Sequence, residues 1–163
     1  MVVVIVGPGV VAASAETHEV VRVAHPAVTA SVIDVGPVGS SPGDLRTYWT
    51  TLTKPGTVAA IGSMSGSLLT TAVDKPRAGY ELRTAALVFT IGAAANQLEV
   101  GGIAKYRRQA PTVSRSESVI RPVVGGSGRY AGATGWCRST HKADNTWRHT
   151  FHLWLPGSAT GRG

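Results

Sequence analysis

The sequence predicts an all-β protein, an antiparallel β-barrel of about eight strands around a lumen for a small molecule. Short runs rich in Val, Ile, Thr and Ala alternate with Gly- and Pro-containing breaks along the chain, as in strands joined by turns. Runs of Leu, Glu and Lys at helical spacing are absent. Glycines recur inside successive strand-like runs, which a sharply curled sheet requires. A β-sandwich is the competing architecture.

The strand-like runs follow one another with short connections and no crossover helix. The first, residues 18–34, is broken at Pro26. The predicted later strands are residues 44–53, 57–73, 80–91, 97–107, 112–124, 136–141 and 147–155. Turn signals separate them, such as Lys54-Pro55-Gly56. We therefore expect a barrel domain over residues 36–155 and a flexible tail over residues 156–163.

The first 35 residues allow three interpretations: an arm, a lid or a first strand. Residues 1–15 are apolar and end in Ala13-Ser14-Ala15, as a signal segment does, but no Lys or Arg precedes them. We therefore expect a cytoplasmic protein, with secretion as the alternative. No apolar run approaches the ~20 residues of a membrane span, so no membrane association is expected.

Composition limits the partners and cofactors. The formal charge of +7 comes from 16 basic and 9 acidic residues. Lys105-Tyr106-Arg107-Arg108 is the only dense basic cluster, which we interpret as a solvated strand end and not as a nucleic-acid patch. The positive charge is also compatible with attraction of an anionic small substrate. Cys137 is the single cysteine, so neither an intramolecular disulfide nor a cysteine-based metal site is expected.

The stretch VVGGSGRYAGATG, residues 123–135, has five glycines in thirteen positions. It lacks the Lys of a phosphate-binding Walker loop and does not complete a dinucleotide fingerprint, and no helical pattern follows it. We interpret it as a sharp bend between strands, because glycine accepts positive φ.

The same stretch resembles the signature of the allene oxide cyclase and dirigent superfamily, which has Gly-Gly-Thr/Ser-Gly, one residue, and an aromatic residue. Gly43-Asp44, the Gly62 and Gly66 pair and residues 90–102 are similar to other parts of that family, so the resemblance covers residues 36–155. It implies an eight-stranded barrel with a ligand-sized lumen, usually oligomeric, that works without a bound cofactor or metal. We expect a homo-oligomer, with a dimer favoured.

The last hairpin supplies most site candidates. With a three-residue loop at residues 143–145, one face carries six side chains that we expect to point inward. They are Cys137, Ser139, His141, Trp147, His149 and Phe151. In the spirotetronate cyclases that it resembles, inward positions carry Arg and Trp where this chain has Cys137 and Ser139, which argues against the same substrate.

We expect His141, His149 and Tyr48 to be catalytic, since each offers a polar group to a carbonyl. The predicted substrate-binding residues are Trp49, Tyr80, Glu99, Cys137, Ser139, Trp147 and Phe151. Plainer alternatives stay open: hydrogen-bonded interior histidines, aromatic side chains in the core, and a packed cysteine. Glu99 and Asp44 are internal acids or face water.

The resemblance implies a cofactor-independent cyclase of bacterial natural-product (polyketide) biosynthesis. It would fold a hydrophobic, linear polyene in the lumen for an intramolecular [4+2], Diels–Alder-type, cyclisation. A non-catalytic small-molecule-binding or dirigent-like barrel is one alternative. An enzyme similar to allene oxide cyclase that uses a lumen acid is the other.

Overall fold

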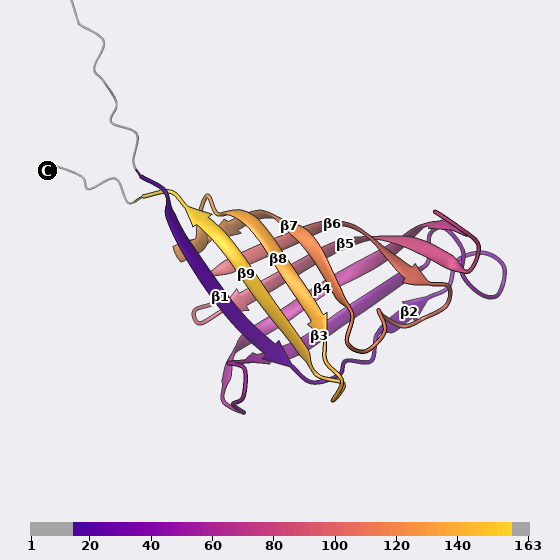
Figure 1. The fold of residues 1–163 in the computed structure, drawn as a ribbon, viewed down its shortest axis with the longest axis horizontal. Coiled ribbons are helices and arrows are strands. Elements are labelled where there is room, and N and C mark those ends of the chain that lie inside the picture. The colour runs from indigo at the N-terminus through magenta and orange to yellow at the C-terminus, as the bar shows by residue number, and fades with distance from the viewer. Residues whose placement is uncertain (1–14, 158–163) are drawn as a thin grey trace, which may run out of the picture.

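In the computed structural model, which describes residues 15–157, the chain is a closed antiparallel sheet (Figure 1). The strands are β1 (Thr17–His25), β2 (Ser31–Ile33), β3 (Leu45–Thr53), β4 (Ala60–Val73), β5 (Tyr80–Ile91), β6 (Gln97–Arg107), β7 (Ser118–Ser127), β8 (Thr134–His141) and β9 (Trp147–Leu155). A short 3₁₀ helix, η1 (Gly128–Tyr130), connects β7 to β8. The predicted eight-stranded barrel is confirmed, since β2 is a three-residue addition to a ring of eight.

The ring runs β1-β9-β8-β7-β6-β5-β4-β3 and closes where Ala24 of β1 pairs with Thr53 of β3. β2 then pairs with the other end of β3, from Ser31 opposite Thr47. β1 and β2 therefore form one interrupted barrel strand, and residues 26–30 leave the ladder between them. Pro26 begins this interruption because proline has no N–H to donate to a ladder.

The barrel begins earlier in the chain than the predicted boundary at residue 36. β1 pairs with β9 over nine residues, from Thr17 opposite Leu155 to His25 opposite Trp147. Of the three interpretations for the first 35 residues, a strand therefore applies to residues 17–25. The signal-like segment, up to residue 14, and the tail from residue 158 lie outside the described residues.

The strand predicted over residues 112–124 is shorter and starts later than expected. Residues 112–117 form a loop, in which the carboxylate of Glu117 accepts a hydrogen bond from the N–H of Ser114 at 3.0 Å. Ser116 has a positive φ of 66°, which a strand residue does not adopt. β7 instead extends to Ser127, so that Gly125 and Gly126 belong to the strand.

The glycine-rich stretch combines a strand end with the predicted bend. Gly126 has an ordinary φ, but a Cβ there would lie 2.4 Å from the carbonyl oxygen of Tyr130. The bend itself starts at Gly128, whose φ is +59°. Gly126 thus permits a close backbone approach, and Gly128 turns the chain.

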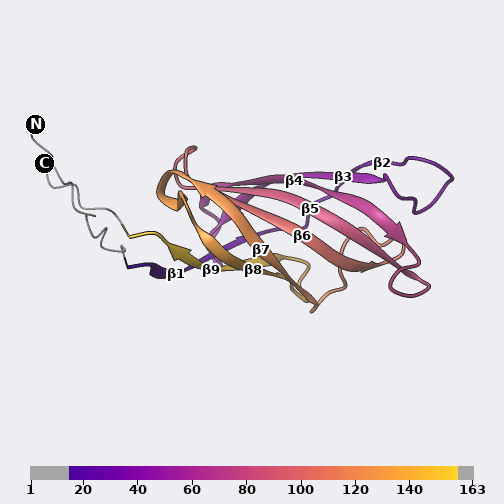
Figure 2. The same ribbon diagram turned by 90° about the horizontal axis from the view of Figure 1, so that it is seen from above.

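An apolar core fills the end of the barrel beside η1. Its buried side chains include Phe89, Leu98, Val100, Tyr130 and Phe151. The rings of Phe89 and Phe151 meet edge to face with centroids 5.0 Å apart. Figure 2 shows the start of β1 and the end of β9 at one end of the molecule and β2 at the other. Between this core and β2 the barrel encloses a cavity, whose lining includes Val32 of β2.

Candidate functional site

The barrel contains a cavity of about 430 Å³. Its apolar wall includes Met64, Leu68 and Leu87, and the interrupted segment between β1 and β2 contributes residues 27–30. Its polar side chains are His25, Thr29, Arg46, Tyr48, Tyr106, Thr112, Arg121, Ser139, His141, Asn145 and His149, with Trp147 beside them. A cavity of this size, apolar with a few convergent polar groups, suits a small organic ligand.

The β8–β9 hairpin places the predicted side chains on the interior face. His141 pairs with Trp147, Ser139 with His149, and Cys137 with Phe151, as the three-residue loop requires. Ser139, His141, Trp147 and His149 line the cavity. Cys137 and Phe151 are fully buried and belong to the core beneath it.

His149 and His141 differ in what their ring nitrogens contact. Nδ1 of His149 lies 2.8 Å from Oγ of Ser139, while its buried Nε2 has no hydrogen-bond partner among the described residues. Burial, together with nearby His25 and Arg121, holds the pKa of His149 well below its usual value, so the ring is neutral. Both nitrogens of His141 are engaged, Nδ1 with the carbonyl of Val113 and Nε2 with Oδ1 of Asn145, each at 2.8 Å.

Two further polar atoms of the cavity wall are buried without a partner in the described part of the chain. One is Oη of Tyr48, and burial raises the pKa of this phenol to about 12, so it keeps its proton. The other is Nε of Arg121, whose Nη2 donates to Oη of Tyr106 at 2.5 Å. With Nε2 of His149, these atoms have hydrogen-bonding capacity that no described residue uses.

Aromatic rings stack along one side of the cavity. The rings of His141 and Trp147 are nearly parallel, with centroids 4.7 Å apart and an interplanar angle of 2°. His25 stacks on His149 at 5.1 Å. Rings that cover one another's faces leave their edges, which carry positive charge density, for other contacts.

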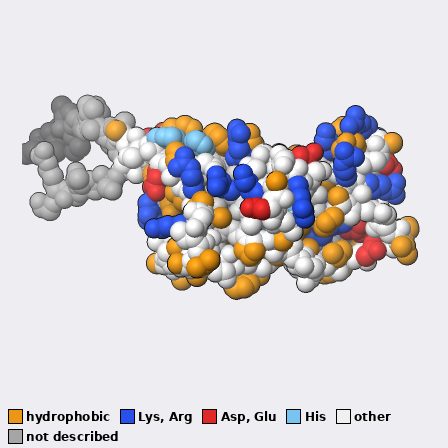
Figure 3. Space-filling model, turned by 60° about the horizontal axis from the view of Figure 1, so that its bottom comes forward, with side chains coloured by type: hydrophobic (Ala, Val, Ile, Leu, Met, Phe, Trp, Pro, Cys, Tyr) orange, Lys and Arg blue, Asp and Glu red, His pale blue; other side chains and the backbone are white. Residues whose placement is uncertain are grey.

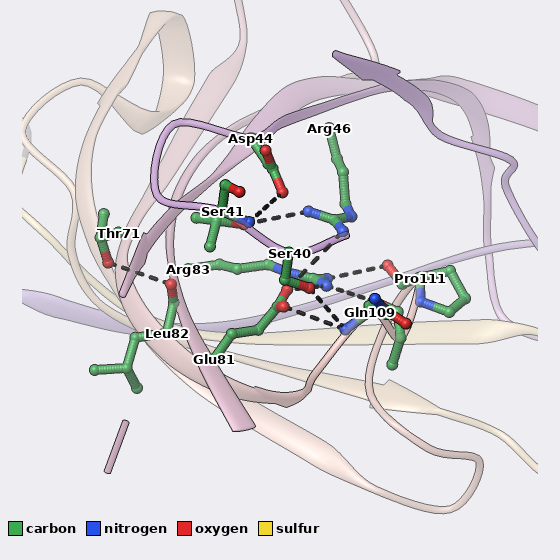
Figure 4. A network of polar contacts seen from close by, with 12 residues as sticks. Ser40, Ser41, Asp44, Arg46, Thr71, Glu81, Leu82, Arg83, Gln109 and Pro111 are labelled. Carbon is green, nitrogen blue, oxygen red and sulfur yellow. Dashed lines mark hydrogen bonds and ion pairs between the residues drawn. The ribbon is translucent and has the colours of Figure 1, made fainter. Parts of the chain in front are cut away.

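A buried charged cluster adjoins the cavity (Figure 4). Glu81 and Arg83 are both fully buried and form an ion pair, and Arg83 also donates to the carbonyls of Ala110 and Pro111. Nη2 of Arg46 lies 3.9 Å from Oε1 of Glu81. Burial alone would raise the pKa of Glu81, but the Ser40 hydroxyl, Arg83 and the N–H of Gln109 hold it below its usual value. This carboxylate is therefore ionised and engaged.

Trp49 and Glu99 do not line the cavity, contrary to the prediction. Trp49 is 66% exposed, because Arg46 and Tyr48 face inward on β3 and alternation turns Trp49 outward. Glu99 lies between the buried Leu98 and Val100 of β6 and is exposed for the same reason. Tyr48 and Trp49 are neighbours on one strand, so both could not face the lumen.

Tyr80 also lies outside the lumen. It starts β5 with the outward parity, since Glu81 and Arg83 face inward. Its Oη accepts a hydrogen bond from Arg77 at 2.9 Å, and Lys105 and Arg107 pack over its ring. The charged residues of the basic cluster, Lys105, Arg107 and Arg108, are exposed at the end of β6. Figure 3 shows Lys and Arg in several separate groups over the visible face.

Cys137 does not have the properties of a nucleophile. Burial raises the pKa of its thiol to about 12, so the sulfur stays protonated. Asp44, the other candidate acid, accepts hydrogen bonds from the N–H groups of Ser41 at 2.8 Å and Val35 at 3.0 Å. Although burial opposes them, these bonds and Arg46 hold the pKa of Asp44 below its usual value. Neither group offers a thiolate or a transferable carboxylic proton.

The buried arginines Arg46, Arg83 and Arg121, and His25, were missed as interior residues. Arginine is ordinarily a solvent-facing residue. The available signal was strand alternation, because Arg83 shares its parity with Leu87 and Phe89, and Arg121 shares its parity with Val123. Residues 15–157 contain no group of three or more His, Cys, Asp or Glu side chains arranged to hold a metal ion. None of the helices described is long and apolar enough to cross a membrane.

Comparison with solved structures identifies the fold. No protein-family model and no curated protein matches the sequence. A structure described as pyocyanin demethylase is similar, with 17% identity and a TM-score of 0.64 over 83% of this chain and 99% of that one. The pterocarpan synthase dirigent protein GePTS1 has 12% identity and a TM-score of 0.61, covering 94% and 99%. The Diels-Alderase AbmU from Streptomyces koyangensis has 17% identity and a TM-score of 0.62, covering 88% and 70%. The chain thus has the same barrel fold as these solved structures, the fold that the resemblance of its glycine-rich motif implies.

Proposed function

We propose that the protein is a cofactor-independent cyclase of bacterial polyketide biosynthesis, which folds a linear polyene in its cavity for an intramolecular [4+2] cyclisation. One observation carries this proposal. Three buried polar atoms without a protein partner in the described part of the chain, on Tyr48, Arg121 and His149, belong to the lining of a cavity whose other wall is apolar. Such a site can hold an extended apolar chain and polarise one carbonyl on it.

The reaction requires no proton transfer and no leaving group. Three π bonds of a diene and a dienophile become one π bond and two C–C single bonds within the same molecule. The apolar wall formed by Met64, Leu68 and Leu87 would hold the two reacting ends at near-attack distance, which contributes several kcal/mol by reducing the entropic barrier. The hydroxyl of Tyr48 keeps its proton and would donate to the dienophile carbonyl.

The two alternative functions, an enzyme that uses an acid in the lumen and a non-catalytic binding barrel, require different side chains in the site. A lumen acid requires a protonated carboxyl group, but the pKa values of the buried Glu81 and Asp44 are both lowered. This favours the cyclisation over an enzyme that opens a substrate with an internal acid. A non-catalytic, dirigent-like barrel would bind the same precursor without increasing its rate of cyclisation, so turnover separates it from the proposal.

The test uses a linear compound that carries a conjugated diene tethered to an α,β-unsaturated carbonyl. We expect an isomeric product of unchanged mass, formed faster than in buffer and followed by loss of polyene absorbance. Tyr48→Phe should lower kcat about tenfold, the effect of one carbonyl hydrogen bond. Trp49→Phe, on the outer face of the same strand, is the matched control and should leave the rate unchanged. A rate equal to that in buffer would contradict the proposal.

A further inference from the structure

The interior of the barrel carries more positive than negative charge. Arg46, Arg83 and Arg121 are each at most 6% exposed. The buried carboxylates of the described residues are Asp44 and Glu81. Asp44 is used by backbone N–H groups, and Glu81 is the ion-pair partner of Arg83. The positive charge beside the cavity is therefore only partly compensated by protein groups.

Arg121 is the least compensated of the three. It is 4% exposed, and no carboxylate of the described residues lies within ion-pair distance of it. Its Nη2 donates a hydrogen bond to the hydroxyl of Tyr106, while the buried Nε has no partner in this part of the structure. A guanidinium removed from water without an anion costs several kcal/mol. An anion that enters the cavity would compensate this charge.

The surroundings of Arg121 favour an anion as well. Of the described residues that line the cavity, none is Asp or Glu, while Arg46 is a second cation in the wall. Arg121 acts electrostatically on both Tyr48 and His149, which supply the other two unpartnered polar atoms. Two neutral groups and a guanidinium therefore line the same cavity from three different strands, β3, β9 and β7, so an anionic oxygen at Arg121 shares the lumen with two further polar groups.

We infer that the cavity binds an organic anion, a molecule with a carboxylate or enolate oxygen at Arg121 and an apolar body along Met64, Leu68 and Leu87. This inference rests on the proposed function only in that both use the same cavity, and it names the chemical class of the substrate. A planar guanidinium binds a carboxylate or an enolate through paired N–H groups, of which Nε supplies one. The anionic oxygen fixes the orientation of the ligand, and the apolar wall then positions the rest of it.

The experiment compares two fluorescent probes of nearly equal shape. 8-Anilinonaphthalene-1-sulfonate carries one anionic group, and N-phenyl-1-naphthylamine is the same molecule without it. We expect the wild-type protein to bind the sulfonate with a Kd at least about tenfold lower than that of the neutral probe, measured by fluorescence titration. Failure of the sulfonate to bind, or equal Kd values, would overturn the inference without any variant.

Variants then assign the preference to Arg121. Arg121→Gln should bring the two Kd values within about twofold of each other by weakening the sulfonate alone. Arg121→Lys keeps the charge but loses Nε, so it should retain part of the preference. The matched control is Arg138→Gln, an exposed arginine on β8, which should change neither Kd. An equal effect of Arg138→Gln would place the sulfonate on the outer surface and refute the site.

The outcome of this experiment is separable from the test of cyclisation. Anion preference at Arg121 with no acceleration of the linear polyene would leave the inference standing and remove the proposed function. Acceleration of a neutral polyene with equal Kd values for the two probes would support the proposed function and refute the inference of anion binding. Circular dichroism and thermal unfolding of each variant report whether the barrel is intact, and the wild-type comparison decides the inference if Arg121→Gln does not fold.

Discussion

The Oγ of Ser139 lies 2.8 Å from Nδ1 of His149, so a hydroxyl group on β8 orients an imidazole on β9. Sγ of Cys137 lies 3.8 Å from the same Oγ and remains a thiol, because burial raises its pKa to about 12. When the serine hydroxyl donates to Nδ1, the proton of the neutral imidazole is on Nε2, the nitrogen that has no partner among the described residues. His149 then presents an N–H group to the cavity.

Ser139→Ala is expected to lower kcat about tenfold with little change in KM, because it releases the ring of His149 without removing a contact to the apolar wall. Ser139→Thr keeps the hydroxyl and should restore most of the rate. Steady-state kinetics on the linear polyene measure both values. Thr140→Ala, on the outer face of the same strand, serves as the control. If the Ser139→Thr variant were as slow as the alanine variant, an orienting role for the hydroxyl would be contradicted.

Glu81→Gln is expected to reduce the free energy of unfolding by about 3–5 kcal/mol, because it leaves the buried guanidinium of Arg83 without its carboxylate. Urea denaturation measures this loss. Glu99→Gln is the same substitution on the exposed face of β6 and should stay within about 0.5 kcal/mol of the wild type. Equal losses for the two variants would show that Glu81 contributes no more than a surface carboxylate.

The stability of the protein is expected to decrease as the pH falls below about 6.5. Burial lowers the pKa of His149 and of His25, although the Pro26 carbonyl partly opposes the shift at His25. At pH values between the folded and the unfolded pKa, the unfolded chain binds more protons than the folded protein. Each histidine therefore lowers the free energy of unfolding by up to about 1.4 kcal/mol for every unit by which the pH falls. The contribution is complete above the unfolded pKa and is lost as the pH falls toward the folded one.

Urea unfolding at several pH values measures this slope. His149→Gln should make the slope between about pH 6.5 and 5 shallower, by about the amount of one histidine. His18→Gln, on the outer surface, provides the comparison. The Glu81 carboxylate acts in a different window: its lowered pKa gives stability that is present above the usual glutamate pKa and disappears only in stronger acid. An unchanged slope in His149→Gln would show that this ring is not kept neutral by the fold.

Gly126→Ala is expected to destabilise the barrel by about 1–3 kcal/mol, because its methyl group would lie 2.4 Å from the backbone oxygen of Tyr130. In a chain of this length, each kcal/mol lowers Tm by roughly 2–4 °C in thermal unfolding. Gly125→Ala is the adjacent control: an added Cβ there meets no atom within 4 Å, and its Tm should hardly change. If the Gly126→Ala and Gly125→Ala variants had the same Tm, the close approach of the Tyr130 backbone would not explain the glycine at position 126.

Much of the fold could be predicted from the sequence because local residues determine the turns. β5, β6 and β9 have the predicted ends, and turn residues mark most of these: Gly79 and Gly92 flank β5, Asn96 precedes β6, and Pro156 follows β9. The strand-like run at residues 18–34 and its break at Pro26 were predicted, but its place in the ring of the barrel was not. β1 owes its place to a ladder with β9, which is more than a hundred residues away in the chain, and a sequence pattern contains no such long-range pairing.

The site was predictable where one short loop fixes the register, and less so elsewhere. The odd number of residues in the loop at 143–145 places Ser139, His141 and His149 on one face. Arg46 and Arg121 were not foreseen, because a buried arginine depends on partners from other strands, such as Tyr106, that only the closed barrel assembles. Trp49 misled for the opposite reason, since a large apolar side chain is not always inside.

The interruption between β1 and β2 creates a segment that tolerates substitution differently from the glycine-rich stretch. Residues 27–30 border the cavity but belong to no ladder, so their side chains can change during evolution without a cost in strand pairing. Gly126 and Gly128 at the opposite end have less freedom, because a Cβ at either position would lie 2.4 Å from its nearest neighbouring atom. The cavity wall at residues 27–30 and the glycine-rich stretch at residues 123–135 are therefore separate parts of the chain, and a substitution in one need not disturb the other.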